Sequence, residues 1–104
     1  MNRANALYSL GRLSDALGDY DECLTLRRQL VADGRNELLP DLAMVLMNRA
    51  NALYSLGRLS DALDDYDECL TLRRQLVADG RNELLPDLAM VLMNRANALD
   101  PWVG

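Results

Sequence analysis

The sequence predicts an all-α protein made of stacked pairs of antiparallel helices, and two observations lead to that prediction. Residues 47–92 repeat residues 1–46 with one change, Gly18 in the first copy and Asp64 in the second. Within each copy, apolar residues recur at spacings of three, four and seven, which is the period of an amphipathic helix. A unit of this length that recurs almost unchanged packs against its own copies, so the interface between copies defines the fold.

The chain of 104 residues is interpreted as a single repeat domain, 1–104. Residues 1–46 are the first repeat, residues 47–92 are the second, and residues 93–104 are a partial third that departs from the pattern after residue 99. Half of the residues are apolar, which is enough for a core. Two periods still leave a large surface, so we expect modest stability unless the ends are covered.

Glycines, a capping residue and the order of charges predict the bounds of the first two helices. Residues 1–10 correspond to the second half of a helix whose first half is present in the later copies. After a break at Gly11, a helix is expected at about residues 14–32, with Ser14 as its N-cap. Its acidic residues come early and its arginines late, which matches the helix dipole. Gly34 supplies a left-handed residue that ends this helix.

A loop or single turn over residues 35–39 then leads to Pro40, which fits a first helical turn because its missing N–H has no partner there. The next helix is expected at about residues 40–56, with apolar residues on two sides and therefore neighbours on two sides. The second copy adds helices at about residues 60–78 and 86–99, for five helices. No stretch alternates like a strand. Gly18 and Asp64 are expected to face solvent.

Composition disfavours several kinds of partner. Sixteen acidic and 11 basic residues give a net charge of -5, whereas nucleic acid and anionic membranes bind basic surfaces. The longest apolar run, residues 42–47, is far shorter than the roughly 20 residues that span a bilayer. The N-terminus lacks the pattern of a secretion signal. We therefore expect a cytoplasmic protein with no nucleic acid or membrane partner.

The two cysteines, Cys23 and Cys69, are one repeat position seen twice. Equivalent positions on neighbouring parallel helices point the same way, which is poor geometry for a disulfide. We expect two reduced, buried thiols that act as small packing groups.

No pattern points to catalysis. The chain has no His, so the cysteines lack their usual general base, and there is no Gly-rich phosphate loop. In the acidic segment from Asp61 to Glu68, Asp64 and Glu68 lie one helical turn apart and could hold a divalent cation. The alternative, a solvated face that complements the helix dipole, is favoured. We expect no enzymatic activity, no metal and no cofactor.

The segment after each glycine turn resembles the second helix of a tetratricopeptide repeat. In that family a glycine turn precedes a large residue, a small residue, an aromatic residue and a second small residue. Small residues let two helices approach closely, and the aromatic ring fills the gap one turn on. The matching residues are Gly57, Leu59, Ala62, Tyr66 and Cys69, and in the first copy Gly11, Leu13, Ala16, Tyr20 and Cys23. The resemblance implies a tetratricopeptide-like α-solenoid; a generic array of helical hairpins is the alternative.

Two features depart from the family pattern. The period is 46 residues where the family usually has 34, so both helices and the loop should be longer. As part of this first departure, the second helix continues through Arg73 and Arg74, where the family has a closing proline. Arg49 and Ala50 stand where the family usually has a large apolar residue followed by glycine, and the sequence assigns Arg49 no role.

In the family resembled, the first helices of successive repeats line a concave groove that binds an extended peptide or a partner helix. The resemblance places in this groove Met44, Met47, Asn48, Asn51, Tyr54 and Ser55, with Met1, Asn2, Asn5, Tyr8 and Ser9 before them and Met90, Met93, Asn94 and Asn97 after. Asparagines can pair with peptide amides, while tyrosines and methionines offer apolar contact. In the competing interpretation Asn48 and Asn51 bond between repeats and Met47 is core. The lysines that clamp a peptide carboxylate in some members are absent.

Self-association is a second class of function. The last helix, residues 86–99, is apolar on two sides with no second helix after it, and residues 1–10 lack the half that corresponds to residues 38–46. Solenoid ends normally carry polar caps, and residues 100–102 are a poor substitute. Chains are hypothesised to stack head to tail or to lend the final helix to a neighbour. Whether the copies arose by duplication or by construction, a scaffold without a dedicated ligand is the alternative to a binding module.

Overall fold

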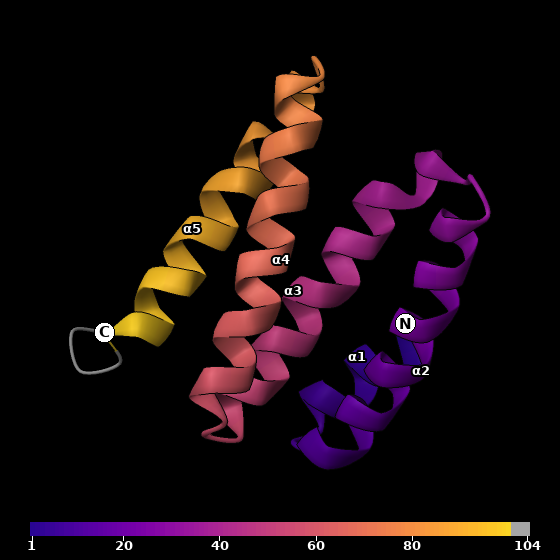
Figure 1. The fold of residues 1–104 in the computed structure, drawn as a ribbon. Helices are drawn as coiled ribbons and strands as arrows, with labels where there is room; N and C mark the ends of the chain where they lie inside the picture. The colour runs from indigo at the N-terminus through magenta and orange to yellow at the C-terminus, as the bar shows by residue number, and fades with distance from the viewer. Residues whose placement is uncertain (101–104) are drawn as a thin grey trace.

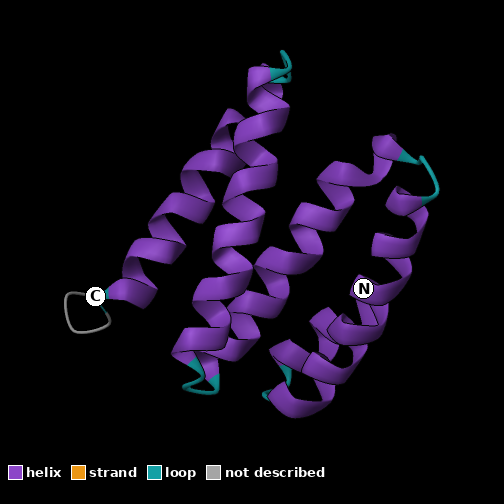
Figure 2. Ribbon diagram, in the orientation of Figure 1, coloured by secondary structure: helices purple, strands orange, loops and turns teal. Residues whose placement is uncertain are grey.

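The computed structural model describes residues 1–100; of residues 100–102, expected to be a poor substitute for a polar cap, Pro101 and Trp102 lie outside the described residues. The described chain is helical throughout, with short connecting loops and no strand between residues 1 and 100 (Figure 2). Its five α-helices are α1 (Asn2–Ser9), α2 (Leu13–Ala32), α3 (Leu39–Ser55), α4 (Leu59–Ala78) and α5 (Leu85–Leu99), with short 3-10 turns η1 (Asn36–Leu38) and η2 (Asn82–Leu84) before α3 and α5.

Each helix packs against the next one in the chain, so that α1 contacts α2, α2 contacts α3, and the order continues to α5 (Figure 1). Because consecutive helices are joined by tight turns, neighbours run antiparallel. Helices α1, α3 and α5 are the first helices of their hairpins, and α2 and α4 are the second helices. The predicted all-α stack of antiparallel helix pairs is confirmed.

A glycine turn sets the start of each second helix. Gly57 takes a φ of 80°, and the following Arg58 N–H donates to the carbonyl oxygen of Leu53 at 2.9 Å. Glycine adopts this left-handed conformation without the strain that a Cβ would add. The turn leaves one residue before α4 begins at Leu59.

The N-cap role expected for Ser14 is wrong. Arg12 holds the N-cap position of α2 without any side-chain capping bond, and the helix begins at Leu13. The turn at Gly11 is so short that Ser14 already lies inside the first helical turn. Arg12 instead donates to the carboxylate of Asp15 at 2.6 Å. Pro40 does lie in the first turn of α3, as expected.

Helix α3 forms the centre of the core. Leu46 and Leu53 are fully buried, and the helix packs on both α2 and α4, as its two apolar sides predicted. On α4, the small Ala62 has no exposed surface and Tyr66 is 2% exposed. The small residue and the aromatic of the repeat pattern therefore do the packing that the pattern implies.

Identical repeat positions are not equally buried. Gly18 and Asp64 are both exposed, as expected. Cys69 is fully buried, and its thiol donates to the Ala43 carbonyl oxygen at 3.2 Å. Burial raises the pKa of the Cys69 thiol to about 11. Cys23 is free like Cys69 but only partly buried, so the expectation of two buried thiols is wrong for Cys23. Helix α1 begins at Asn2 and has no residue equivalent to Ala43 to cover it.

Leu53 and Leu99 test this gradient of burial, because they share a repeat position but are 0% and 56% exposed. We predict that Leu53→Ala lowers the free energy of unfolding by about 2–5 kcal/mol, since it leaves a cavity in a packed core. Leu99→Ala should lower it by less than about 1 kcal/mol. Urea unfolding followed by far-ultraviolet circular dichroism at low protein concentration measures both, and equal losses would contradict the packing.

Candidate functional site

Two adjoining hollows lie along the first helices of the repeats. The first, of about 240 Å³, is lined by Asn5, Tyr8, Ser9, Tyr20, Asn48 and Asn51. The second, also of about 240 Å³, is lined by Tyr8, Asn51, Tyr54, Tyr66, Asn94 and Asn97. Tyr8 and Asn51 line both hollows, so the two are neighbours and together make a groove of two hollows across α1, α3 and α5. We call it the asparagine–tyrosine groove; every residue that lines it is uncharged.

Buried tyrosines hold the floor of this groove. The Tyr66 hydroxyl donates to Asn51 Oδ1 at 2.5 Å, and the Tyr20 hydroxyl donates to Asn5 Oδ1 at 2.5 Å. Burial raises the pKa of Tyr66 to about 12, so its hydroxyl remains a donor at neutral pH. Sequence reasoning gave Tyr66 a packing role only. The sequence does hold a signal for this hydrogen bond, because a phenyl ring would pack equally well at this position. A buried tyrosine hydroxyl usually has a hydrogen-bond partner.

Asn51 also links neighbouring repeats. Asn94 Nδ2 on α5 donates to Asn51 Oδ1 on α3 at 3.3 Å, and Asn48 Nδ2 donates to the Met1 sulfur at 3.3 Å. The interpretation in which these asparagines bond between repeats therefore holds for part of their surface. Both of these bonds of Asn51, from Tyr66 and Asn94, are accepted by its side-chain oxygen, and neither involves its amide nitrogen.

The expected groove residues separate into two groups. Those that line the hollows are Asn5, Tyr8, Ser9, Asn48, Asn51, Tyr54, Asn94 and Asn97. Those that do not are Met1, Asn2, Met44, Met47, Ser55, Met90 and Met93. Met47 is only 4% exposed and belongs to the core, as the competing interpretation had it. Ser55 is exposed at the end of α3, where its hydroxyl lies 3.2 Å from that of Tyr8.

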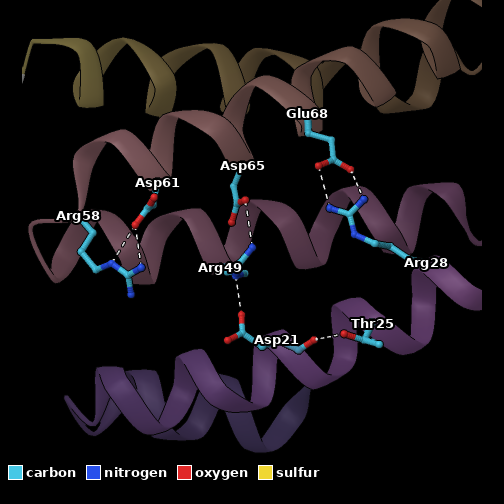
Figure 3. Close-up of polar contacts among 8 residues, drawn as sticks. All are labelled: Asp21, Thr25, Arg28, Arg49, Arg58, Asp61, Asp65 and Glu68. Carbon is cyan, nitrogen blue, oxygen red and sulfur yellow. Dashed lines mark hydrogen bonds and ion pairs between the residues drawn. The ribbon is translucent and has the colours of Figure 1, made fainter.

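Arg49, which the sequence left without a role, lies between carboxylates of two second helices (Figure 3). Its Nε is 2.6 Å from Asp21 Oδ1 on α2, and its Nη1 is 3.2 Å from Asp65 Oδ1 on α4. One guanidinium on α3 thus joins two repeats. We call this contact the arginine bridge.

The equivalent arginines on α1 and α5 each hold half of an arginine bridge. Arg3 Nε lies 3.5 Å from Asp19, the counterpart of Asp65. Arg95 Nε lies 2.5 Å from Asp67, the counterpart of Asp21. The bridge is therefore a repeating feature that is complete only at Arg49 among the described residues.

Other acidic residues of α4 are also paired with arginines. Glu68 accepts two bonds from Arg28, at 2.7 and 2.8 Å, and Asp61 accepts from Arg58 (Figure 3). In the pair considered as a cation site, Glu68 is thus already bonded to arginine while Asp64 is exposed to solvent. Over residues 1–100 no group of three or more His, Cys, Asp or Glu side chains is placed to hold a metal ion.

The fold and its repeating first-helix groove define an α-solenoid repeat protein. Residues 43–76 and residues 1–34 each match the sequence pattern of the tetratricopeptide repeat. The chain belongs to the tetratricopeptide repeat family. Each matched span has 34 residues, 12 fewer than the period, and residues 35–42, with η1 and the first turn of α3, fall between the two spans. Comparison with curated proteins and with solved structures gave no match.

Repeats of this family generally mediate protein–protein interaction, and the family is generally a non-enzymatic scaffold. Among the helices of residues 1–100, none is both long enough and apolar enough to cross a bilayer.

Asp65 is the buried end of the arginine bridge, with 6% of its surface exposed. Burial raises the pKa of its carboxyl group to about 6, and the attraction of Arg49 only partly opposes that effect. The second oxygen, Oδ2, accepts no hydrogen bond within the described residues. The ionised form is therefore held in a site that favours the protonated form.

Asp65→Asn tests this balance. Because the folded-state pKa of about 6 lies above the ordinary 3.8, the folded chain binds the proton more tightly than the unfolded chain between these values. The contribution of the Asp65 carboxyl group to the free energy of unfolding is therefore fully present below about pH 4 and is lost as the pH rises through about 6. We predict that the unfolding free energy of the unsubstituted chain, minus that of Asp65→Asn, falls by about 2 kcal/mol between about pH 4 and pH 7.

Urea unfolding across this pH range measures the difference. Asp19→Asn is the matched control, since Asp19 holds the same repeat position beside Arg3 with 24% of its side chain exposed. When Asp65→Asn is added to the Asp19→Asn chain, the difference in unfolding free energy between the two chains should fall with pH by the same amount. A difference that grows with pH would mean that the Arg49 charge outweighs burial.

Proposed function

We propose that the asparagine–tyrosine groove binds an extended, uncharged stretch of a partner protein. The observation that supports this most directly is the pair of adjoining hollows across three first helices, lined only by amide, hydroxyl and phenol groups. The proposal agrees with the general role of the tetratricopeptide repeat family, whose repeats mediate protein–protein interaction.

The lining chemistry favours an extended ligand over a helical one. An extended peptide presents unpaired backbone N–H and C=O groups, whereas a helix satisfies its own. An asparagine amide offers both a donor and an acceptor, so it can pair with both backbone groups. The rings of Tyr8 and Tyr54, each partly exposed, add apolar contact between these pairs.

The same lining groups support binding over chemistry. Amides and a serine hydroxyl do not titrate near neutral pH, and burial raises the pKa values of Tyr20 and Tyr66 still further above it. A neutral lining also implies that ligand affinity depends little on salt, because no charge is paired or screened.

Linear peptides selected from a displayed random library provide the test. Asn97→Ala and Tyr54→Ala should each raise the dissociation constant of a selected peptide by about 5–10-fold, because each removes a polar or ring contact worth about 1 kcal/mol. Asn51 is avoided, because its oxygen holds Tyr66 and Asn94. Fluorescence anisotropy on the 104-residue chain measures the constants.

Asn2→Ala is the matched control, because Asn2 is an exposed asparagine of α1 that lines neither hollow. The dissociation constant of the selected peptide from the Asn2→Ala chain should equal that from the unsubstituted chain. A library that yields no peptide, or a peptide that binds Asn97→Ala and Tyr54→Ala unchanged, would refute the groove as the binding site.

A further inference from the structure

One apolar face of α5 is left uncovered by the helices of residues 1–100. It consists of Ala89, Leu92, Met93, Ala96 and Leu99, and we call it the open face. Leu92, Met93 and Leu99 are 40%, 67% and 56% exposed. One repeat earlier, the same positions of α3 are at most 4% exposed; they are Ala43, Leu46, Met47, Ala50 and Leu53.

Helix α4 covers these positions on α3. Cys69 bonds to the Ala43 carbonyl oxygen, and Ala62 and Tyr66 belong to the same packed cluster as Leu46 and Leu53. The open face therefore has the shape that receives a helix of the α4 sequence. Helix α2 has that sequence apart from Gly18, whose counterpart Asp64 is exposed. A second copy of this chain thus carries a helix that fits.

Helix α2 has the complementary defect. A hollow of about 330 Å³ beside it is lined by Cys23, Leu26, Arg27, Leu30, Leu38 and Asp41. Leu30 is 40% exposed, whereas its counterpart Leu76 on α4 is 7% exposed. The first half of α3 lies over α4 at this level, as the bond from Cys69 to Ala43 shows. Helix α1 has no residues that correspond to this half, but residues 85–92 of α5 do.

Charges on the two surfaces match in the same register. Arg28 on α2 bonds to Glu68 on α4, so a second copy added one repeat further on brings its Glu22 to Arg74. Arg74 and Glu22 are both exposed. The same register brings Asp19 of the second copy to Arg95, which already bonds to Asp67. This contact would complete a second arginine bridge.

We propose that α5 of one chain docks on α2 of a second copy, in the place that α1 of that copy occupies. Residues 93–99 have the same sequence as residues 1–7, so α5 remakes the contacts of α1. The hydroxyl of Tyr20, which donates to Asn5, passes to Asn97. Residues 85–92 then fill the hollow beside α2, which α1 leaves empty.

The exchange is favoured because α1 is weakly held. It has 8 residues and buries two of them, Ala4 and Leu7, and a helix of this length has little stability of its own. Helix α5 has 15 residues and brings its open face out of water on docking. The two docked surfaces differ, so the contact is heterologous and chains join head to tail.

Two substitutions on α5 separate this docking from unspecific association. Ala96→Glu places a carboxylate where the counterpart Ala50 is fully buried, so docking would bury an unpaired charge. Met90→Glu is the control, because Met90 is 56% exposed and its counterpart Met44 is still 44% exposed after α4 has packed. Both sites are exposed in the single chain, so its far-ultraviolet circular dichroism should not change.

Light scattering over a hundredfold range of concentration, on the 104-residue chain, gives the result. The unsubstituted chain and Met90→Glu should exceed the monomer mass at the same concentration, and Ala96→Glu should require at least about 10-fold more. A monomer mass throughout overturns the proposal. So does an equal loss in Met90→Glu, which removes the larger of the two exposed apolar side chains and would indicate unspecific adhesion.

A charge-reversal pair tests the register independently. Arg74→Glu and Glu22→Arg each bring like charges together in the docked state, so each alone should weaken association by about threefold. In an equal mixture, the Arg74→Glu chain meets the Glu22→Arg chain with opposite charges, and association should recover. Mixing without recovery overturns the proposed register.

Discussion

The structure depends on one constraint, the burial of each first helix between two second helices. Helix α3 meets it fully, since Leu46 and Leu53 have no exposed surface between α2 and α4. Helices α1 and α5 meet it in part, because within residues 1–100 each packs on one second helix over most of its length. Stability in a stack of this kind is a sum over neighbouring interfaces, so it is greatest at α3 and decreases toward both ends.

The arginine bridge aligns the repeats more than it stabilises them. Burial raises the pKa of Asp65 to about 6 even though Arg49 lies 3.2 Å away, so the attraction does not fully offset the loss of hydration. Buried ion pairs often behave in this way. A shift of α3 along α2 or α4 would leave the Arg49 guanidinium partly buried without a carboxylate. The bridge therefore penalises wrong registers between otherwise similar apolar surfaces.

Much of the fold could be predicted from local signals, but features that depend on a third helix could not. Helix bounds followed from periodicity, Gly57 and Pro40, because turn and first-turn preferences are properties of the local backbone. Cys23 and Cys69 have almost the same sequence around them and differ in burial, which only their neighbours decide. Arg49 draws its partners from 28 residues earlier and 16 residues later, so no spacing within one helix predicts them.

The groove shows how near-identical repeats still give side chains different roles. Asn5, Asn51 and Asn97 share one repeat position, but the Asn51 oxygen is occupied by both Tyr66 and Asn94. Asn51 therefore links α3 to α4 and α5 through its side-chain oxygen, whereas Asn97 is exposed at the edge of the groove. In the binding mode proposed for the groove, an uncharged and periodic lining pairs with the backbone of an extended chain, which is common to all peptides. Under the same proposal, selectivity comes from the rings of Tyr8 and Tyr54, which recur with the repeat and favour ligands whose apolar side chains recur with it.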